Sequence, residues 1–358
     1  MKQYSGEVVY IYAFDIAYEM ADTRIGELLG HPAAEFAADI SKHGPQELLF
    51  YRPEMVRLPP WDRVGPHGSV RIHRTIKVLP MGAISITLRV PFEVDRLEEL
   101  VGYHDLELSG RRLHDEVREL AEQVRRELTP LCLRPTEQVR EEEAYTVFCV
   151  GSPIPSTQDW LKTNQRAVAA LLTEEKDAEK LSQREVEKVM ERSLSYYDRD
   201  LTVIDWDAAL LVDDPRNFDE VLHIMELANV QLTELEAYDR ILDKALERAY
   251  RDVAGRRLWG RSDVLDDIRE MRIDFARLSD ELSNITKFFG DWYLARIYQQ
   301  LSERFHLADW NQVMDSKLKT LDELYEILKA DRDSRWMMLM EATIVLLFIV
   351  DLALIFKK

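Results

Sequence analysis

The chain has 358 residues, of which only 13 are glycine and 13 are proline, and it carries 47 Lys and Arg against 66 Asp and Glu. This length leaves room for two domains, or for one domain and an extended helical part, and the scarcity of Gly and Pro argues against an all-β protein. A formal net charge of −19 excludes a general electrostatic attraction to nucleic acid, so we expect no direct nucleic-acid contact.

The first 155 residues show the alternation of apolar and polar side chains that is typical of β-strands. A Pro-Met-Gly turn separates two of the predicted strands, and a run of charged and apolar residues after them predicts one long or two shorter helices. We therefore expect an α+β domain over residues 1–155. The predicted elements are strands at 7–18, 69–80, 82–94 and 144–150, helix within 96–130, and a Pro/Gly loop at 58–69.

The sequence "GSPIPSTQDW" marks the predicted boundary, because two prolines end the preceding strand and Ser156 or Thr157 can cap a helix. Beyond it, residues 156–334 are expected to be mainly helical. Apolar residues spaced by threes and fours along 221–249 and 268–289 predict a coiled-coil-like antiparallel hairpin, and a further helix begins near Asp309. The same spacing is typical of both an internal core and an association between chains.

The segment 336–356 contains 21 residues, enough for a helix of about 31 Å, and twelve of them are Leu, Ile, Val or Phe. These twelve contribute about −4 to −7 kcal/mol to membrane insertion. Five basic residues lie shortly before the segment and two follow it, which predicts a single-pass tail anchor with the bulk of the chain in the cytoplasm. The basic residues are Lys317, Lys319, Lys329, Arg332, Arg335, Lys357 and Lys358. We expect the inner (cytoplasmic) membrane as the location.

Glu341 and Asp351 interrupt this apolar segment. Ten residues at about 100° each place them roughly 80° apart around a helix, on one broad side. Each carboxyl is either protonated, drawn to the polar interface or paired with another chain. Pairing with another chain predicts a homo-oligomer, and it also leaves open a subunit of an oligomeric channel or transporter.

Signatures of catalysis are missing from the sequence. It contains no Gly-rich phosphate loop, HExxH, GxSxG or paired CxxC, and its eight histidines form no tight ligand pair. The cysteines, Cys132 and Cys149, lack metal-site spacing and are expected to be reduced thiols. We therefore predict no catalytic residues, no cofactor and no metal site.

One acidic stretch, "YYDRDLTVIDWDAALLVDD", keeps a second hypothesis open. Its six aspartates resemble a Mg²⁺ or Ca²⁺ ligand set in composition but not in the spacing of an EF-hand loop. Helix caps and solvated acids are the favoured interpretation, and a metal-dependent hydrolase or nuclease is the alternative. The aspartates are Asp198, Asp200, Asp205, Asp207, Asp213 and Asp214.

The stretch "NITKFFGDWYLARIYQQLSERFHL" holds more aromatic residues than one helix buries on a narrow seam. Part of this face is expected to meet the α+β domain or an unknown protein partner. Internal docking is the favoured interpretation. The residues are Phe288, Phe289, Trp292, Tyr293 and Tyr298.

The C-terminal pattern resembles the family named "required for meiotic nuclear division". The residues that carry it are Arg335, then Leu339-Met340-Glu341, then "IVLL", then Asp351 ten positions after Glu341. Upstream, "KLKTLDELYEIL", "LPMGAISITLRVPFEVDRLEEL" and "EEEAYTVF" are similar to the pre-anchor helix and two strands of that family, although Met81 stands where the family favours an aromatic residue. The resemblance implies a membrane-tethered, self-associating α+β domain with a helical stalk and no catalytic residues. One eukaryotic member is a mitochondrial inner-membrane protein implicated in organelle translation.

Taken together, these observations predict a non-enzymatic, membrane-anchored scaffold or tether. It would self-associate and present its α+β domain to protein partners in the cytoplasm.

Overall fold

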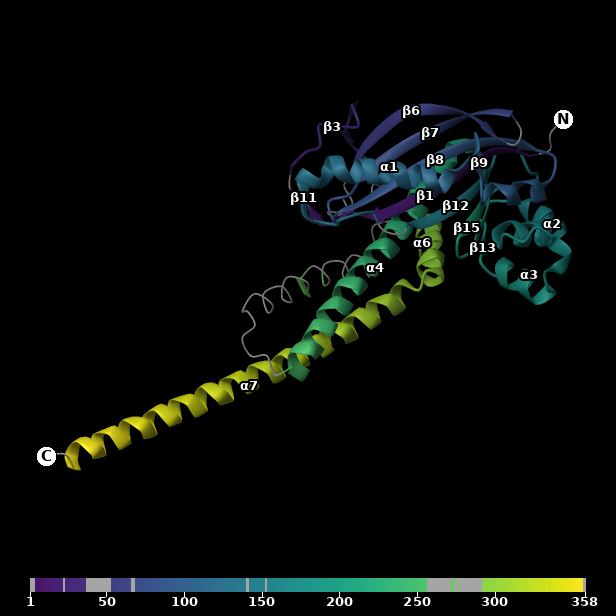
Figure 1. The fold of residues 1–358 in the computed structure, drawn as a ribbon. Helices are drawn as coiled ribbons and strands as arrows, with labels where there is room; N and C mark the ends of the chain where they lie inside the picture. The colour runs from purple at the N-terminus through teal and green to yellow at the C-terminus, as the bar shows by residue number, and fades with distance from the viewer. Residues whose placement is uncertain are drawn as a thin grey trace. The chain divides into compact units, whose positions relative to one another are not determined.

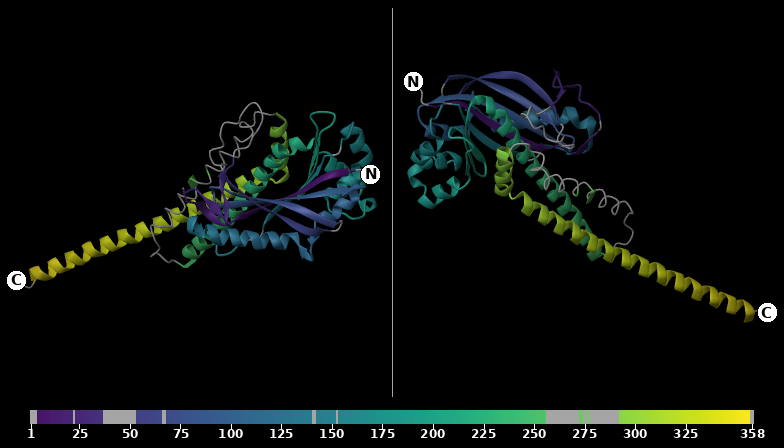
Figure 2. Two further views of the ribbon diagram at one scale, coloured as in Figure 1. Left: turned by 90° about the horizontal axis from the view of Figure 1, so that it is seen from above. Right: turned by 180° about the vertical axis from the view of Figure 1, so that it is seen from behind.

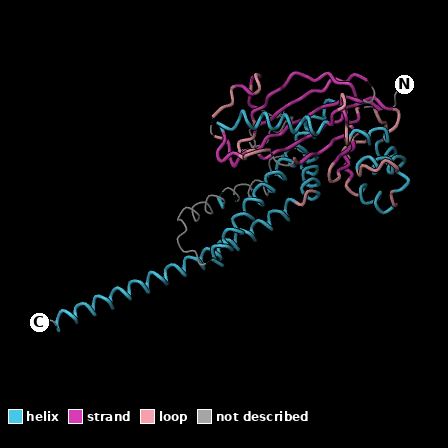
Figure 3. The backbone as a smooth tube through the Cα atoms, in the orientation of Figure 1, coloured by secondary structure: helices cyan, strands magenta, loops and turns pink. Residues whose placement is uncertain are grey.

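The computed structural model describes residues 4–21, 23–36, 53–65, 68–139, 142–151, 153–255, 272–273, 276 and 292–356. The chain divides into two compact units, Met1–Leu235 with Ser283–Ala308 and Glu236–Leu282 with Asp309–Lys358. Two long helices, α4 (Phe218–Gly255) and α7 (Leu307–Phe356), contribute to both units. Figure 3 shows that strands belong to the first unit, whereas helix α7 continues to the end of the described chain.

Within the described residues, nine strands form one sheet in the order β13-β14-β15-β12-β1-β8-β7-β6-β5. Every neighbouring pair is antiparallel except β12 and β15, which are parallel. The strands are β1 (Tyr4–Asp15), β5 (Ala34–Glu35), β6 (Glu54–Gly65), β7 (Gly68–Val78), β8 (Ala83–Val94), β12 (Glu143–Val150), β13 (Ser193–Leu194), β14 (Leu201–Ile204) and β15 (Ala208–Val212). Short pairs accompany the sheet, namely β2 (Ala17–Met20) with β11 (Cys132–Pro135), β3 (Glu27–Leu28) with β4 (His31–Pro32), and β9 (Glu107–Leu108) with β10 (Arg111–Arg112).

The expected mixed α+β class is confirmed, and the predicted strands at 7–18, 69–80, 82–94 and 144–150 correspond to β1, β7, β8 and β12. The predicted loop at 58–69 is wrong for its first eight residues, which belong to β6. The register of β6 on β7 shifts between Leu58 and Trp61, at the two prolines. Proline lacks an N–H for the ladder, and a register shift is where a strand tolerates that loss.

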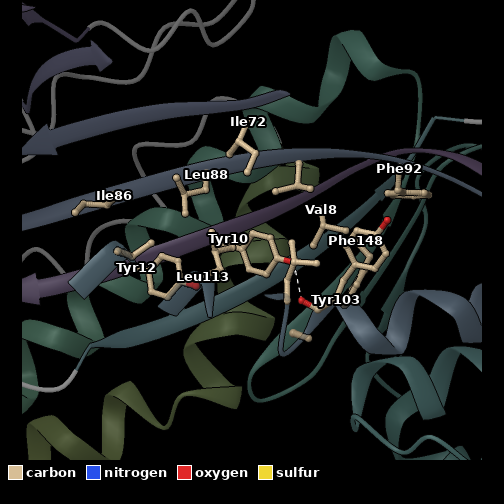
Figure 4. Packing of buried hydrophobic residues seen from close by; sticks show 14 of the residues in the cluster. Val8, Tyr10, Tyr12, Ile72, Ile86, Leu88, Phe92, Tyr103, Leu113 and Phe148 are labelled. Atoms are coloured by element: carbon tan, nitrogen blue, oxygen red, sulfur yellow. Dashed lines mark hydrogen bonds between the residues drawn. The ribbon is translucent and has the colours of Figure 1, made fainter. Parts of the chain in front are cut away.

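One face of the sheet carries the main core of the first unit. Along β1 the side chains of Val8, Tyr10, Tyr12 and Phe14 are buried on this face, against helix α1 (Leu113–Leu128). Figure 4 shows this packing and the hydrogen bond in which the Tyr10 hydroxyl donates to the carbonyl of Tyr103, 2.6 Å away. Tyr103 ends the 3-10 helix η1 (Leu97–Tyr103), so the predicted helical stretch 96–130 is split into η1 and α1.

The β13–β15 end of the sheet is buried on both faces. Helices α2 (Thr157–Leu172) and α3 (Gln183–Met190) cover one side, and α6 (Trp292–Arg304) packs against β14. Ser156 caps α2 as predicted, because its hydroxyl accepts a hydrogen bond from the Asp159 N–H. Residues 156–235, predicted to begin a separate helical region, thus lie in the first unit and contribute three strands to its sheet.

In the second unit, α4 and α7 lie side by side and run in the same direction (Figures 1 and 2). Lys317 of α7 pairs with Asp239 and Asp243 of α4, and Leu242, Leu318 and Leu321 are buried there. The second helix of the predicted antiparallel hairpin, 268–289, lies almost entirely outside the described residues. Among the residues whose side chains are described, which on α7 end at residue 350, no helix is long and apolar enough to cross a membrane.

Candidate functional site

The sheet face opposite α1 is polar between β6 and β8. Strand alternation places there every second residue of each strand, and the register aligns Arg57 with Thr75 and Thr75 with Thr87. In the next row His73 lies opposite Arg89. These strands are therefore apolar on the α1 side and carry cations and hydroxyl groups on the other.

The first turns of α4 pass over part of this polar face and leave a cavity of about 700 Å³. The cavity is floored by β1, β6, β7 and β8, and its wall includes Asp219, Leu222 and Glu226 of α4. All of these residues belong to the first unit. The volume lies within the range of small-molecule sites, about 300–1,000 Å³.

A buried ion pair forms part of the lining of the cavity. The Lys77 ammonium pairs with the Glu226 carboxylate, and the hydroxyl of Ser85 donates to the same carboxylate at 2.6 Å. His223 Nδ1 lies 3.9 Å from Glu226 Oε2. Burial alone would raise the pKa of Glu226, but Lys77 and His223 hold it at about 2. Burial lowers the pKa of His223.

A second charged cluster lies further along the floor. Arg89 pairs with Asp219 of α4 and, at 3.3 Å, with Glu7 of β1. Burial raises the pKa of the Glu7 carboxyl, and the Arg89 guanidinium only partly offsets this. The cluster thus joins β8, β1 and the start of α4 through one guanidinium group.

The two clusters differ in what they offer to a ligand. Lys77, Ser85 and Glu226 are each less than a tenth exposed and satisfy one another, so they fix α4 against the sheet. Arg57 and His73 are exposed at the cavity, and no ion pair joins Arg57 to any other residue that the structure describes. The available chemistry is therefore hydrogen-bond donation from cations and hydroxyls.

The aromatic residues that were predicted to share one face have different environments in the structure. Tyr298 is buried and its hydroxyl donates to Gln231 at 2.7 Å, while Tyr293 shares a 3.0 Å hydrogen bond with Thr202. Trp292 is 80% exposed. Phe288 and Phe289 lie outside the described residues. Two of the three described aromatics thus bind α6 to its own unit.

Within the acidic stretch, the side chains of Asp200, Asp205 and Asp214 bind groups of the fold. Asp200 accepts hydrogen bonds from the N–H groups of Tyr196 and Tyr197, Asp214 caps a short 3-10 helix, and Asp205 pairs with Arg304 of α6. No group of three or more His, Cys, Asp or Glu in the described part of the chain could hold a metal ion. The remaining members of the stretch are Asp198, Asp207 and Asp213.

Glu341 is exposed on α7, and Asp351 lies on the same helix, although its side chain is outside the description. Both are far along the chain from the cavity, which sequence reasoning did not find. The signal that could have found it is the alternation His73, Thr75, Lys77 on one predicted strand and Ser85, Thr87, Arg89 on the next. Polar residues at such positions normally indicate only a solvated face.

Comparison with known proteins covers mainly the first unit. The family model described as "Uncharacterized protein MJ0711, N-terminal domain" matches residues 5–219, which include the whole floor of the cavity. A protein of Methanocaldococcus jannaschii named "Uncharacterized protein MJ0711" is 24% identical over 219 residues. This alignment covers 60% of the present chain and 66%, just under two thirds, of that relative. No solved structure matches. Because the family model covers more than half of the chain, this protein belongs to the family of the MJ0711 N-terminal domain.

Proposed function

We propose that the protein is a non-enzymatic scaffold or tether, held at a membrane through the end of α7 and presenting its α+β domain to cytoplasmic partners. One observation carries this proposal. Every large apolar side chain of α7 between residues 336 and 350 is exposed, by 47% to 73%. They are Trp336, Met337, Met338, Leu339, Met340, Ile344, Val345, Leu346, Leu347, Phe348, Ile349 and Val350.

An apolar helix surface of this size, broken between residues 336 and 350 by Glu341 and Thr343, is unusual in a water-exposed protein, and it indicates a membrane or protein partner. A bilayer suits it because the apolar residues surround the helix instead of forming one stripe. The helical backbone continues to Phe356, so residues 336–356 are about 31 Å long. The Thr343 hydroxyl donates to the Leu339 carbonyl at 2.8 Å, which satisfies it without water.

The proposed orientation and assembly rest on charge. Lys317, Lys319 and Lys329 precede the apolar segment, together with two arginines, and this bias keeps the α+β domain on the cytoplasmic side. Glu341 and Asp351 are the acidic residues that such an anchor must accommodate, either at the polar interface or against a second copy. We include self-association in the proposal for this reason, in agreement with the resemblance to the required-for-meiotic-nuclear-division family.

Alkaline carbonate extraction of the untagged full chain tests the anchor. The wild-type chain is expected in the membrane pellet, and the double variant Leu346→Arg/Leu347→Arg in the supernatant. Two central arginines cost about 5–7 kcal/mol, comparable to the whole gain from insertion. The matched control, Val313→Arg/Ile327→Arg, changes two exposed apolar residues earlier on the same helix and is expected to stay in the pellet. Release of the wild-type chain by carbonate would overturn the proposal.

The mass of the full chain in mild detergent tests self-association separately. We expect an oligomer, and we expect Glu341→Leu to weaken it if the carboxyl pairs between chains. A monomer at micromolar concentration would remove this part of the proposal and leave the anchor standing.

A further inference from the structure

We infer that the cavity between β6–β8 and the start of α4 binds a small phosphate-bearing molecule, with Arg57 and His73 as the groups that recognise the phosphate. The inference does not depend on membrane anchoring, because the cavity lies wholly in the first unit. It rests on the placement of charges, on the hydroxyls of the floor and on the shape of the site.

Most of the acidic groups that line the cavity form ion pairs or hydrogen bonds within the structure. Glu226 is bound by Lys77 and Ser85, and both Glu7 and Asp219 are bound by Arg89. Glu220 is the remaining carboxyl of the lining. Repulsion of an anion is therefore much weaker than the number of acids suggests.

Not all the cations that line the cavity are paired in this way. Arg57 is exposed at the cavity and forms no ion pair within the described residues, in a chain whose net charge is −19. His73 lies diagonally across from it, because Arg57 aligns with Thr75 on the strand that carries both Thr75 and His73. A guanidinium group and an imidazole that share one cavity are typical partners of a phosphate group.

Hydroxyl donors complete the floor. Thr75 and Thr87 are directly paired across β7 and β8, and both line the cavity beside the two cations. Half-buried hydroxyls in this position supply neutral hydrogen bonds to phosphate oxygens. A sheet face that served only to pack against a helix would be apolar, as the opposite face of these strands is.

The wall indicates an organic ligand, not a free ion. Met55, Leu58 and Leu222 line the cavity together with the polar floor. A volume of about 700 Å³ exceeds the need of one phosphate group and suits a molecule of nucleotide size. The phosphate would face Arg57 and His73. The apolar part of the molecule would contact Met55, Leu58 and Leu222.

Isothermal titration of the full chain in detergent, with AMP and with inorganic phosphate as probes, tests the inference. We expect saturable binding of AMP with a Kd below about 1 mM and weaker binding of phosphate. Arg57→Ala and His73→Ala should each weaken AMP binding about 10-fold, the effect of losing one charge-assisted hydrogen bond. The matched control is Arg184→Ala, an exposed arginine on α3, and it should leave binding within about 2-fold of wild type.

Two results would overturn the inference. One is the absence of saturable binding of either probe at about 10 mM. The other is binding that neither Arg57→Ala nor His73→Ala weakens, since the site would then lie elsewhere. Both side chains are exposed, so folding should be unchanged, and an unaltered thermal midpoint checks this. Thr87→Val provides an additional variant that keeps the shape of the floor while removing one donor.

Discussion

The Lys77 ammonium of β7 and the Glu226 carboxylate of α4 form a buried ion pair across 149 residues of sequence. Lys77 is 7% exposed and Glu226 is 4% exposed. The pair lies where the sheet meets the first turns of α4, and the Ser85 hydroxyl donates a second hydrogen bond to the Glu226 carboxylate. It fixes the position of the helix that forms the cavity wall.

Breaking this pair from one side should be more damaging than replacing it altogether. Lys77→Met leaves the Glu226 carboxylate buried without its cation, and we expect a loss of about 3–5 kcal/mol in the free energy of unfolding. The double variant Lys77→Met/Glu226→Leu should lose clearly less than the two single variants added together. Urea unfolding of the full chain in detergent measures all three.

Lys162→Met is the control, because Lys162 pairs with Asp159 on an exposed helix surface. We expect it to change the free energy of unfolding by at most about 1 kcal/mol. If the double variant were as unstable as the sum of the single ones, the pair would have no coupling, and its role in fixing α4 would be disproved.

Acid should destabilise the first unit through Glu226. The pKa of this carboxyl is about 2 in the folded chain, against an ordinary value of 4.5. The folded state therefore binds fewer protons than the unfolded state between these values. The stabilising contribution, roughly 3 kcal/mol, is complete above about pH 4.5 and is lost as the pH falls toward 2.

His223 adds to this trend, because burial lowers its pKa and its protonation therefore favours unfolding as the pH falls below its ordinary value of 6.5. Unfolding curves at successive pH values, for the wild type and for Glu226→Gln, measure the Glu226 part. Glu226→Gln should be less stable at neutral pH and should show a shallower loss of stability between pH 4.5 and 2. Parallel pH profiles would contradict the assignment.

The strands of the first unit could be predicted because their apolar alternation is a local property of the sequence. The cavity could not, because the same alternation predicts a solvated face for His73, Thr75 and Thr87. Only the register of three strands and the placement of α4 convert that face into a lined cavity. The partner of Lys77 is equally inaccessible to local reasoning, since it lies on a distant helix.

The acidic stretch shows a second limit. Its aspartates drew attention to metal binding, whereas its apolar residues form β14 and β15. These strands have four and five residues and are buried on both faces, so they lack the alternation that identifies a half-buried strand. Asp205 and Asp207 lie at the hairpin between them, a position that favours aspartate for conformational reasons.

The tight turn between β7 and β8 should tolerate no side chain at Gly82. Its φ of +90° is a conformation that other residues rarely adopt, and an added Cβ would meet the backbone of Ala17. The Gly82 carbonyl also accepts hydrogen bonds from the N–H groups of Ile16 and Ala17, at 3.0 and 3.1 Å. We expect Gly82→Ala to lower the free energy of unfolding by at least about 2 kcal/mol.

Gly102 provides the matched control for this substitution, because nothing lies within 4 Å of a Cβ added there. Gly102→Ala should stay within about 1 kcal/mol of the wild type. Equal effects of the two substitutions, measured by the same urea unfolding, would show that the turn does not constrain Gly82.

The aromatic residues of α6 offer a test of internal docking against partner binding. Tyr298→Phe removes the hydroxyl that donates to Gln231, whose side chain is 4% exposed, and leaves a buried acceptor unpaired. We expect a loss of about 1–3 kcal/mol in the free energy of unfolding.

Trp292→Ala changes a side chain that is 80% exposed and should alter stability by no more than about 0.5 kcal/mol. The opposite order would mean that Trp292, and not Tyr298, holds α6 in place. If Trp292→Ala leaves stability intact, as expected, and also lowers the mass of the detergent-solubilised assembly, the exposed end of α6 is a contact between chains, because only an interface couples an exposed aromatic to assembly without affecting the fold.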